Sequence, residues 1–333
     1  MNDEKSAVPR RIVWAVDAFD DPEHLRSLAP QLLNSLARQQ NWGHIEVVPV
    51  YVLSPGDINL TIEFSGLWLE QYREAAQKAL EHALKDIQVA NMAHPEVIAE
   101  NFTATAQAAR SLAMHAKAMN AEMIVVPGHG RKGLGRFLTG SFAENVIQYS
   151  HVPVVILRPK IKISPKIQTI LVPTQFGTKA KAVFRKIVDQ AHGLGARIVL
   201  FHTIPHPVEP ILQSGAYLAG GSWVPVQAYF SVETDRHRRR AEAWARWAEN
   251  QGVPTEVIVD VQGSDIGDSI VYLAKSRNAD LVAMESRSGP IASTLLGSIT
   301  RHVIRNAQCP VWVYRPAFAV APGAHGKPAR RAA

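Results

Sequence analysis

The sequence is poor in cysteine and in long apolar runs, which argues against two broad classes of protein. Cys309 is the single cysteine in 333 residues, so the chain cannot form an internal disulfide, and we expect a reducing compartment. The sequence contains no run of about 20 apolar residues, the length that a membrane-spanning helix needs. The N-terminal segment MNDEKSAVPRR is polar and lacks the apolar stretch of a secretory signal. These features predict a cytoplasmic protein with no membrane partner.

Several catalytic and cofactor motifs are also missing. The 13 histidines are scattered, and the closest pair, His202 and His206, lacks a third ligand at metal spacing. No nucleophilic triad with a supporting motif is found. Gly128 to Gly133 matches the dinucleotide pattern G-x-G-x-x-G, but the next strand ends without the acidic residue that this fold requires, and the G-K-[ST] of a P-loop is absent. The sequence therefore predicts no metal site and no nicotinamide cofactor, and it does not indicate an enzyme.

What the chain does contain is an internal repeat. The segment from Ala121 to Pro159 returns from Ala279 to Pro316 with the same order of apolar runs and turn residues. Ala121 corresponds to Ala279 and Gly140 to Gly297, so the second copy is one residue shorter inside its loop. A chain of this length holds about two domains. We therefore predict an N-terminal domain at 8–159, a linker at 160–166, a C-terminal domain at 167–316 and a disordered tail at 317–333.

Strand-like and helix-like patterns alternate along each copy. The runs IVWAV, IEVVPVYVL and MIVV in the first copy are apolar on both faces, as are TILVP, RIVLFHT, LVAM and VWVY in the second. Segments with apolar residues at helical spacing separate them, for example Pro22 to Gln40. This alternation predicts an α/β fold of two tandem domains, each a five-stranded, parallel, doubly wound sheet with helices on both faces.

A glycine-rich loop joins a strand to a helix in the first copy, between Pro127 and Ser141. It contains no acidic residue, and Arg131 and Lys132 give it positive charge. Glycine lets backbone N–H groups approach a phosphate closely, and a helix N-terminus adds further donors. The same pattern is also typical of a turn that binds nothing, in which Ser141 and Glu144 form a capping box. From the glycines alone, both interpretations stay open.

The loop resembles the signature of the universal stress protein family, which reads G-x-x-G, nine residues and then G-[ST]. Gly130, nine residues and Gly140-Ser141 match this signature. Pro127 stands at the position of the first glycine, with Gly128 one position later. Proline removes a backbone donor and fixes φ, so Gly128 is the expected substitute contact.

The resemblance extends over both copies, from Arg11 to Pro316. It includes the opening strand IVWAVD, the helix SFAENVI and the closing strand HVPVVILRP. It implies a fold like that of the adenine-nucleotide alpha-hydrolases. The closing strands HVPVVILRP and CPVWVYRP also resemble the dimer edge of the family. We therefore expect the two copies to pair there in antiparallel fashion, and whole chains to pair again as a homodimer.

The resemblance further implies a ligand. In ATP-binding members, the aspartate after the first strand lies near the nucleoside, the second strand's backbone lies against adenine, and the glycines and Gly-Ser face ribose and phosphates. We therefore expect the first copy to bind ATP or a related adenine nucleotide with Mg²⁺. The residues implicated are Asp17, Val52, Gly128, His129, Gly130, Arg131, Gly140 and Ser141. His129 is expected either to contact a phosphate or to stabilise the turn.

The second copy departs from this pattern. Gln175 stands where the first copy has Asp17, and Glu285 and Ser288 occupy the two loop-glycine positions. Two unit charges about 4 Å apart repel by roughly 4 kcal/mol at an effective dielectric of 20, which weakens binding about a thousandfold unless Arg287 offsets part of the repulsion. Only Gly297-Ser298 keeps the signature. We predict that this copy does not bind nucleotide in the conventional way.

The function implied is that of a tandem universal stress protein, a nucleotide-responsive binding module of the stress response with an unidentified protein partner. The alternative is an interaction scaffold that binds no nucleotide in either copy. The family also allows slow ATP hydrolysis or autophosphorylation at Ser141, but no general base is evident.

Four smaller features of the sequence each carry a structural prediction. We interpret His237 to Arg240 as a solvated basic helix face with nearby tryptophans packed on the sheet, and do not expect nucleic acid as a partner. The insertion Pro205 to Phe230 is predicted to be a packed loop, a subunit contact or a lid. Asp265 and Asp268 are expected to cap a helix. Cys309 is expected to be buried.

Overall fold

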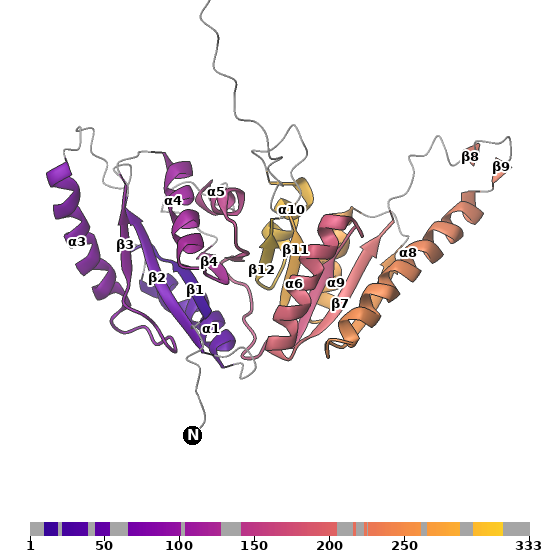
Figure 1. Ribbon diagram of the computed structural model, residues 1–333, viewed down its shortest axis with the longest axis horizontal. Helices are drawn as coiled ribbons and strands as arrows, with labels where there is room; N and C mark the ends of the chain where they lie inside the picture. The colour runs from indigo at the N-terminus through magenta and orange to yellow at the C-terminus, as the bar shows by residue number, and fades with distance from the viewer. Residues whose placement is uncertain are drawn as a thin grey trace, which may run out of the picture.

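The computed structural model describes most of the two copies. The described residues are 10–18, 22–38, 44–53, 66–100, 104–127, 141–204, 216–217, 223–224, 226–260, 265–286 and 296–315. They form one ten-stranded sheet with helices on both faces, as Figure 1 shows from the first copy in indigo to the second in orange and yellow. The predicted α/β fold, with a mostly parallel sheet, is confirmed.

The first copy contributes half of the sheet. Its strands are β1 (Arg10–Ala15), β2 (Ile45–Leu53), β3 (Glu96–Ala99), β4 (Met123–Pro127) and β5 (Val154–Leu157). Its helices are α1 (Pro22–Ala37), α3 (Gly66–Leu84), α4 (Thr105–Ala118) and α5 (Ser141–Tyr149). The strands are parallel in the order β3-β2-β1-β4-β5. Strands that are buried on both faces explain why the sequence shows continuous apolar runs rather than alternation.

The second copy repeats this topology. Its strands are β6 (Thr169–Pro173), β7 (Arg197–Thr203), β10 (Thr255–Asp260), β11 (Leu281–Glu285) and β12 (Val311–Tyr314). Its helices are α6 (Thr178–Leu194), α8 (Val226–Glu249), α9 (Ile266–Ser276) and α10 (Ser298–Asn306). The order β10-β7-β6-β11-β12 matches the first copy strand for strand. The internal repeat therefore describes two copies of one fold.

The insertion of the second copy ends earlier than predicted. A short antiparallel pair, β8 (Ala216–Tyr217) with β9 (Trp223–Val224), lies inside it, and α8 already begins at Val226. The prediction that the insertion runs to Phe230 was therefore wrong at that end. Glycine and proline, the strongest helix breakers, stop at Pro225, and nothing after that residue prevents a helix. The residues around the pair lie outside the described part of the chain.

The two halves join through their closing strands. β12 pairs antiparallel with β5, with Trp312 opposite Val155. This pairing confirms the expected antiparallel edge contact between the copies. It also closes two sheet edges that would otherwise expose unpaired backbone groups. Across the same seam, Arg301 of α10 lies 3.4 Å from Glu144 of α5, the carboxylate of the predicted capping box.

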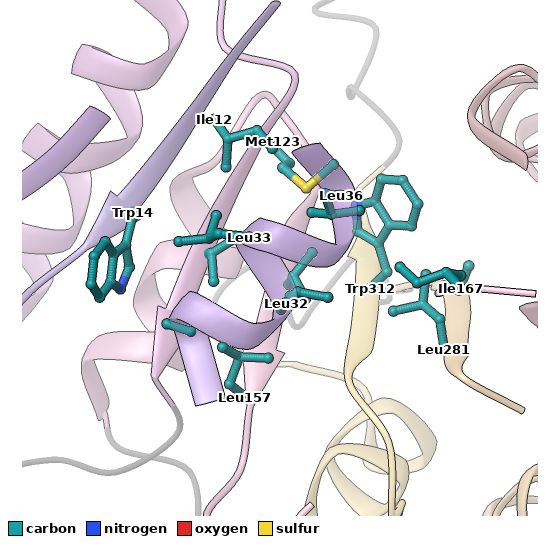
Figure 2. Close-up of a cluster of buried hydrophobic side chains, with 14 of the residues drawn as sticks. Ile12, Trp14, Leu32, Leu33, Leu36, Met123, Leu157, Ile167, Leu281 and Trp312 are labelled. Atoms are coloured by element: carbon teal, nitrogen blue, oxygen red, sulfur yellow. The ribbon is translucent and has the colours of Figure 1, made fainter. Parts of the chain in front are cut away.

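The hydrophobic core continues through the seam. On one face of the sheet it is covered by α1, α3, α6 and α8, and on the other by α4, α5, α9 and α10. Figure 2 shows Trp312 of β12 between Leu36 of α1, from the first copy, and Ile167 and Leu281 of the second. Trp312 is 1% exposed and Leu36 is 2% exposed. Because one continuous cluster includes residues of both copies, the two halves share a core.

Candidate functional site

The candidate site of the first copy lies at the carboxyl edge of its sheet. β1 lies between β2 and β4, and the strand order reverses at this point. In open α/β sheets, ligands bind in the crevice outside the strand ends at such a switch point. The backbone N–H of Val16 still donates to the carbonyl of Val50 at 2.9 Å, so the chain leaves the sheet only at the half-buried Asp17. Asp17 is thus placed at the carboxyl edge of the sheet, just beyond the end of β1.

Val52 contributes to this edge through its backbone. Its side chain is 8% exposed and packs in the core on the face that α4 and α5 cover. The side chain of Val52 is therefore not available to a ligand, and the expected backbone contact with adenine stays a prediction. β4 ends nearby at Pro127, and α5 begins at Ser141.

Most of the predicted phosphate contacts fall outside the described residues. These are Gly128, His129, Gly130, Arg131 and Gly140. Ser141 is described as the first residue of α5, but its side chain is not. The structure brings Asp17, Val52 and the start of α5 to the carboxyl edge, and the role of the loop in binding stays a prediction.

The second copy places its substitutions at matching positions. Gln175 follows β6 as Asp17 follows β1, and Glu285 ends β11 as Pro127 ends β4. The ladder supports this correspondence, because Pro173 pairs with Phe201 where Ala15 pairs with Val50. A carboxylate therefore occupies the strand end where the family has its first loop glycine.

A pocket of about 500 Å³ opens at this edge of the second copy, and we call it the second-copy pocket. Its lining comes from the ends of β6, β7 and β11, the first turns of α9 and α10, and His237 of α8. Pockets that hold small molecules typically span about 300–1,000 Å³. A pocket of ligand size thus lies in the copy for which the sequence predicted no conventional nucleotide binding.

His202 is the principal polar group of this pocket. Its side chain is 6% exposed, and its Nδ1 lies 2.7 Å from the carbonyl oxygen of Thr174. Its ring stacks on His237, with centroids 4.4 Å apart, and lies 4.8 Å from the ring of Phe176. Burial lowers the pKa of His202, the hydrogen bond to Thr174 opposes this, and the charge of His237 lowers the pKa further. The imidazole is therefore neutral at pH 7.

Sequence reasoning considered His202 only as a metal ligand and missed this role. By the strand register, His202 occupies the position of Tyr51 in the first copy. A histidine inside an otherwise apolar strand was the available signal. Its partner His237 could not be identified in advance, because the contact depends on how α8 packs against β7.

The basic stretch on α8 is as predicted for its three arginines but not for His237, which is half-buried and stacks on His202 because α8 packs this side of the helix against β7. Arg238, Arg239 and Arg240 are exposed to solvent. Trp244 stacks on Phe184 with centroids 5.1 Å apart, so the aromatic face of the helix is turned to the core. The three arginines therefore form a solvated basic face, and the absence of a nucleic-acid partner stays a prediction.

The start of α9 corrects one prediction. Asp265 caps the helix, accepting hydrogen bonds from the backbone N–H groups of Gly267 at 2.7 Å and Asp268 at 3.3 Å. Asp268 was also expected to cap, but it pairs instead with His302 of α10 at 2.8 Å. The polar atoms of Asp265, Asp268 and His302 lie within 4.8 Å of one another on the surface.

The predicted burial of Cys309 is confirmed, and burial is the main cause that raises the pKa of its thiol to about 12.

Comparison with known proteins identifies the class to which this fold belongs. The sequence profile described as "Universal stress protein family" matches residues 9–158 and again 166–315. The chain therefore belongs to the universal stress protein family and carries two copies of its domain. Among the residues that the structure describes, no helix is both long and apolar enough to cross a membrane.

Individual relatives agree with this membership. A universal stress protein of Mycolicibacterium smegmatis is 25% identical over 59% of this chain, and the match spans 63% of that relative's length. A Thermus aquaticus relative, described as a universal stress protein in the QAH/OAS sulfhydrylase 3′ region, is 32% identical over 41% of this chain and 89% of its own length.

One of the similar solved structures shows the same fold over most of the chain. A universal stress protein from Archaeoglobus fulgidus is similar with a TM-score of 0.59 at 18% identity, covering 92% of this chain and 96% of that one. Another A. fulgidus universal stress protein, solved in complex with dAMP, covers 44% of this chain and 96% of its own, with 20% identity and a TM-score of 0.31.

Proposed function

We propose that this protein is a nucleotide-responsive module of the stress response, in which the first copy binds ATP or a related adenine nucleotide with Mg²⁺ and the second copy does not. The observation that carries the proposal is the difference at matching strand ends. The first copy has Asp17 and Pro127 there, and the second has Gln175 and Glu285. The two copies therefore differ in sequence at the carboxyl ends of their matching strands.

The chemistry of the first copy fits a nucleotide. The backbone at the end of β2, at Val52, suits a flat base, and a helix N-terminus at Ser141 suits an anion. The loop between them carries glycines and two adjacent cations, Arg131 and Lys132. Mg²⁺ would enter with the phosphates, because it keeps several waters and few protein ligands. No general base is identified, so the proposed role is binding.

Nucleotide binding in the first copy would affect the second copy through the contact between α5 and α10. The proposed phosphate site includes the N-terminus of α5, and Glu144 in the first turn of α5 contacts Arg301 of α10 across the seam. An ordered nucleotide would fix the start of α5 and therefore bias this contact. Such a coupling changes a surface that a protein partner could read.

Two further parts of the proposal concern the assembly and its location. We propose a cytoplasmic homodimer. Because β5 and β12 already pair with each other within one chain, a second dimerisation must use another surface. Light scattering coupled to size exclusion distinguishes a dimer from a monomer of 36.6 kDa.

Native mass spectrometry tests the nucleotide proposal directly. We expect one adenine-nucleotide adduct per chain, carried over from expression or added with Mg²⁺. Gly140→Asp should abolish the rise in melting temperature that ATP causes, since it places a carboxylate at the phosphate site. The matched variant Gly297→Asp in the second copy should leave that rise nearly unchanged.

The alternative scaffold makes the opposite prediction. It expects no adduct and no thermal shift at millimolar Mg-ATP, because neither copy would hold a nucleotide. Equal losses from Gly140→Asp and Gly297→Asp would contradict the proposed asymmetry and would assign binding to both copies.

A further inference from the structure

The seam between the two copies has a local two-fold symmetry. β5 reads VVIL and β12 reads VWVY, and the second residues of the two strands, Val155 and Trp312, lie opposite each other. The first residue of β12, Val311, faces the third residue of β5, Ile156, and the third residue of β12 faces the first residue of β5 in the same way. In a contact of this symmetry, a position on the axis meets its own counterpart in the other copy.

A second position of the repeat also meets its counterpart across the seam. α5 and α10 are both nine residues long and begin at the serine of the repeated Gly-Ser. Glu144 is the fourth residue of α5, and Arg301 is the fourth residue of α10. The Nε atom of Arg301 lies 3.4 Å from a carboxylate oxygen of Glu144, and the two side chains are 29% and 27% exposed. This ion pair therefore joins equivalent residues of the two copies.

At both positions the two copies differ in a complementary way. A carboxylate faces a guanidinium, and a small side chain faces a large one, since Val155 and Trp312 are buried in one core cluster. In the same geometry, two first copies would bring Glu144 against another Glu144 and would leave a cavity between two valines. Two second copies would bring two arginines together and would overfill the core with two tryptophans. Each pairing of like copies thus carries costs that the observed pairing avoids.

One other seam position is the same in both copies and gives no such preference. Arg158 follows β5 and donates from Nη1 to the carbonyl oxygen of Ala307, at the end of α10, at 3.3 Å. Arg315 holds the equivalent position after β12. Because both copies carry arginine here, this position does not distinguish one pairing of the closing strands from another.

We propose that the contacts of Glu144 with Arg301 and of Val155 with Trp312 determine which partner each closing strand accepts. The edge of a first copy accepts a second copy and rejects another first copy. The partner that fits this edge carries a cation at the position of Arg301 and a large aromatic ring at the position of Trp312. The selectivity belongs to the seam and does not depend on nucleotide binding.

Charge reversal in the full chain tests the selectivity. One chain carries Val154→Cys with Glu144→Arg, and the other carries Val313→Cys with Arg301→Glu, because residues 154 and 313 lie opposite each other across the seam. Cys309→Ala in every chain removes the one native thiol. The seam within either chain then holds two like charges, whereas pairing between the chains restores opposite charges at both seams.

The readout is a disulfide between the two chains, detected on a non-reducing gel after they are unfolded together, refolded and oxidised. If each restored pair favours exchange about tenfold, the two seams together favour it about a hundredfold. This gain opposes the advantage that the linker gives to pairing within one chain. The linked dimer should therefore form in several-fold higher yield than from chains that carry the cysteines with native charges.

A matched mixture separates selectivity from mere weakening of the seam. Both chains carry Glu144→Arg together with their cysteines, so every pairing of a first copy with a second copy places two arginines together. The seam is weakened, but exchange between chains gains nothing. This mixture should give no more linked dimer than native charges do. A yield equal to that of the complementary mixture would overturn the proposal.

The melting temperature gives a second measurement that does not require refolding. Glu144→Arg and Arg301→Glu should each lower it, and the double variant should recover most of the summed loss. A helix N-terminus disfavours a cation and favours an anion, but these local effects occur in the single and double variants alike and cancel in the cycle. Losses that simply add in the double variant would overturn the proposal.

An ion pair inside the first copy provides the last control. Arg11 and Glu46, on the neighbouring strands β1 and β2, pair at 2.8 Å and do not touch the seam. Arg11→Glu in one cysteine chain and Glu46→Arg in the other should yield no more linked dimer than native charges do. As much linked dimer from this mixture as from the seam variants would refute the assignment to Glu144 and Arg301.

Discussion

Replacing Trp312 by alanine should destabilise both copies, although the residue belongs to the second. Its side chain is 1% exposed and joins a cluster that includes Leu36 of the first copy and Leu281 of the second. Truncation of a buried tryptophan costs about 3–5 kcal/mol, because transfer free energy is lost and a cavity remains. Since the cavity would open on both sides of the seam, the cost should fall on both halves.

The buried indole N–H of Trp312 affects how much stability each substitution costs. Nε1 of Trp312 is buried without a hydrogen-bond partner in the described structure. An unsatisfied buried donor costs about 1–3 kcal/mol, so its removal offsets part of any loss of packing. Trp312→Phe, which fills much of the space without a donor, should therefore cost less than about 2 kcal/mol.

Hydrogen exchange followed by mass spectrometry measures where the stability is lost. Trp312→Ala should reduce protection in α1 as well as in β11, whereas the control Trp247→Ala should act mainly in the second copy, where Trp247 packs against Phe184. Exchange that increases in β11 while α1 keeps its full protection would refute the shared core. A cost for Trp312→Phe as large as that for alanine would refute the role given to Nε1.

Three other predictions follow from local features. Burial lowers the pKa of His202 in the folded state, so on acidification the unfolded chain binds a proton at a higher pH than the folded protein does. The free energy of unfolding should therefore fall as the pH drops below about 6.5, and His202→Phe should flatten that part of the pH profile measured by urea unfolding. Cys309, whose pKa is raised to about 12, should not react with a thiol reagent at pH 8 until the protein unfolds. Asp265→Ala should cost about 1 kcal/mol through loss of the α9 cap, and Asp268→Ala should cost less.

The order and type of the main elements were predictable because the signals are local. Buried parallel strands appear as apolar runs such as IEVVPVYVL, and the repeat fixes the second copy once the first is read. The pairing of β5 with β12 was also predictable, since both closing strands resemble one known edge. The helix cap at Asp265 follows from its position just before an apolar run.

The contacts that define the second-copy pocket were not predictable in the same way. His202 meets His237 only because α8 crosses β7, and residues far apart in sequence leave no periodic signal. Asp268 was assigned to a cap because its partner, His302, lies on another helix. Residues 128–140 carry most of the signature on which the proposed nucleotide binding rests, and they lie outside the described residues, so only the nucleotide experiments test that proposal.

The seam gives a physical reason why the carboxyl edge of one copy can change in sequence without loss of the fold. The second copy contributes β12 to cover the edge of β5, and Trp312 to complete a core that both copies share. These contributions do not involve Gln175 or Glu285, which lie at the carboxyl edge beyond the ends of β6 and β11. Substitutions at that edge should therefore cost the shared core little. If the edge and the core are separable in this way, Glu285→Gln should leave hydrogen exchange in β12 and α1 unaltered, and faster exchange in either element would contradict the separation.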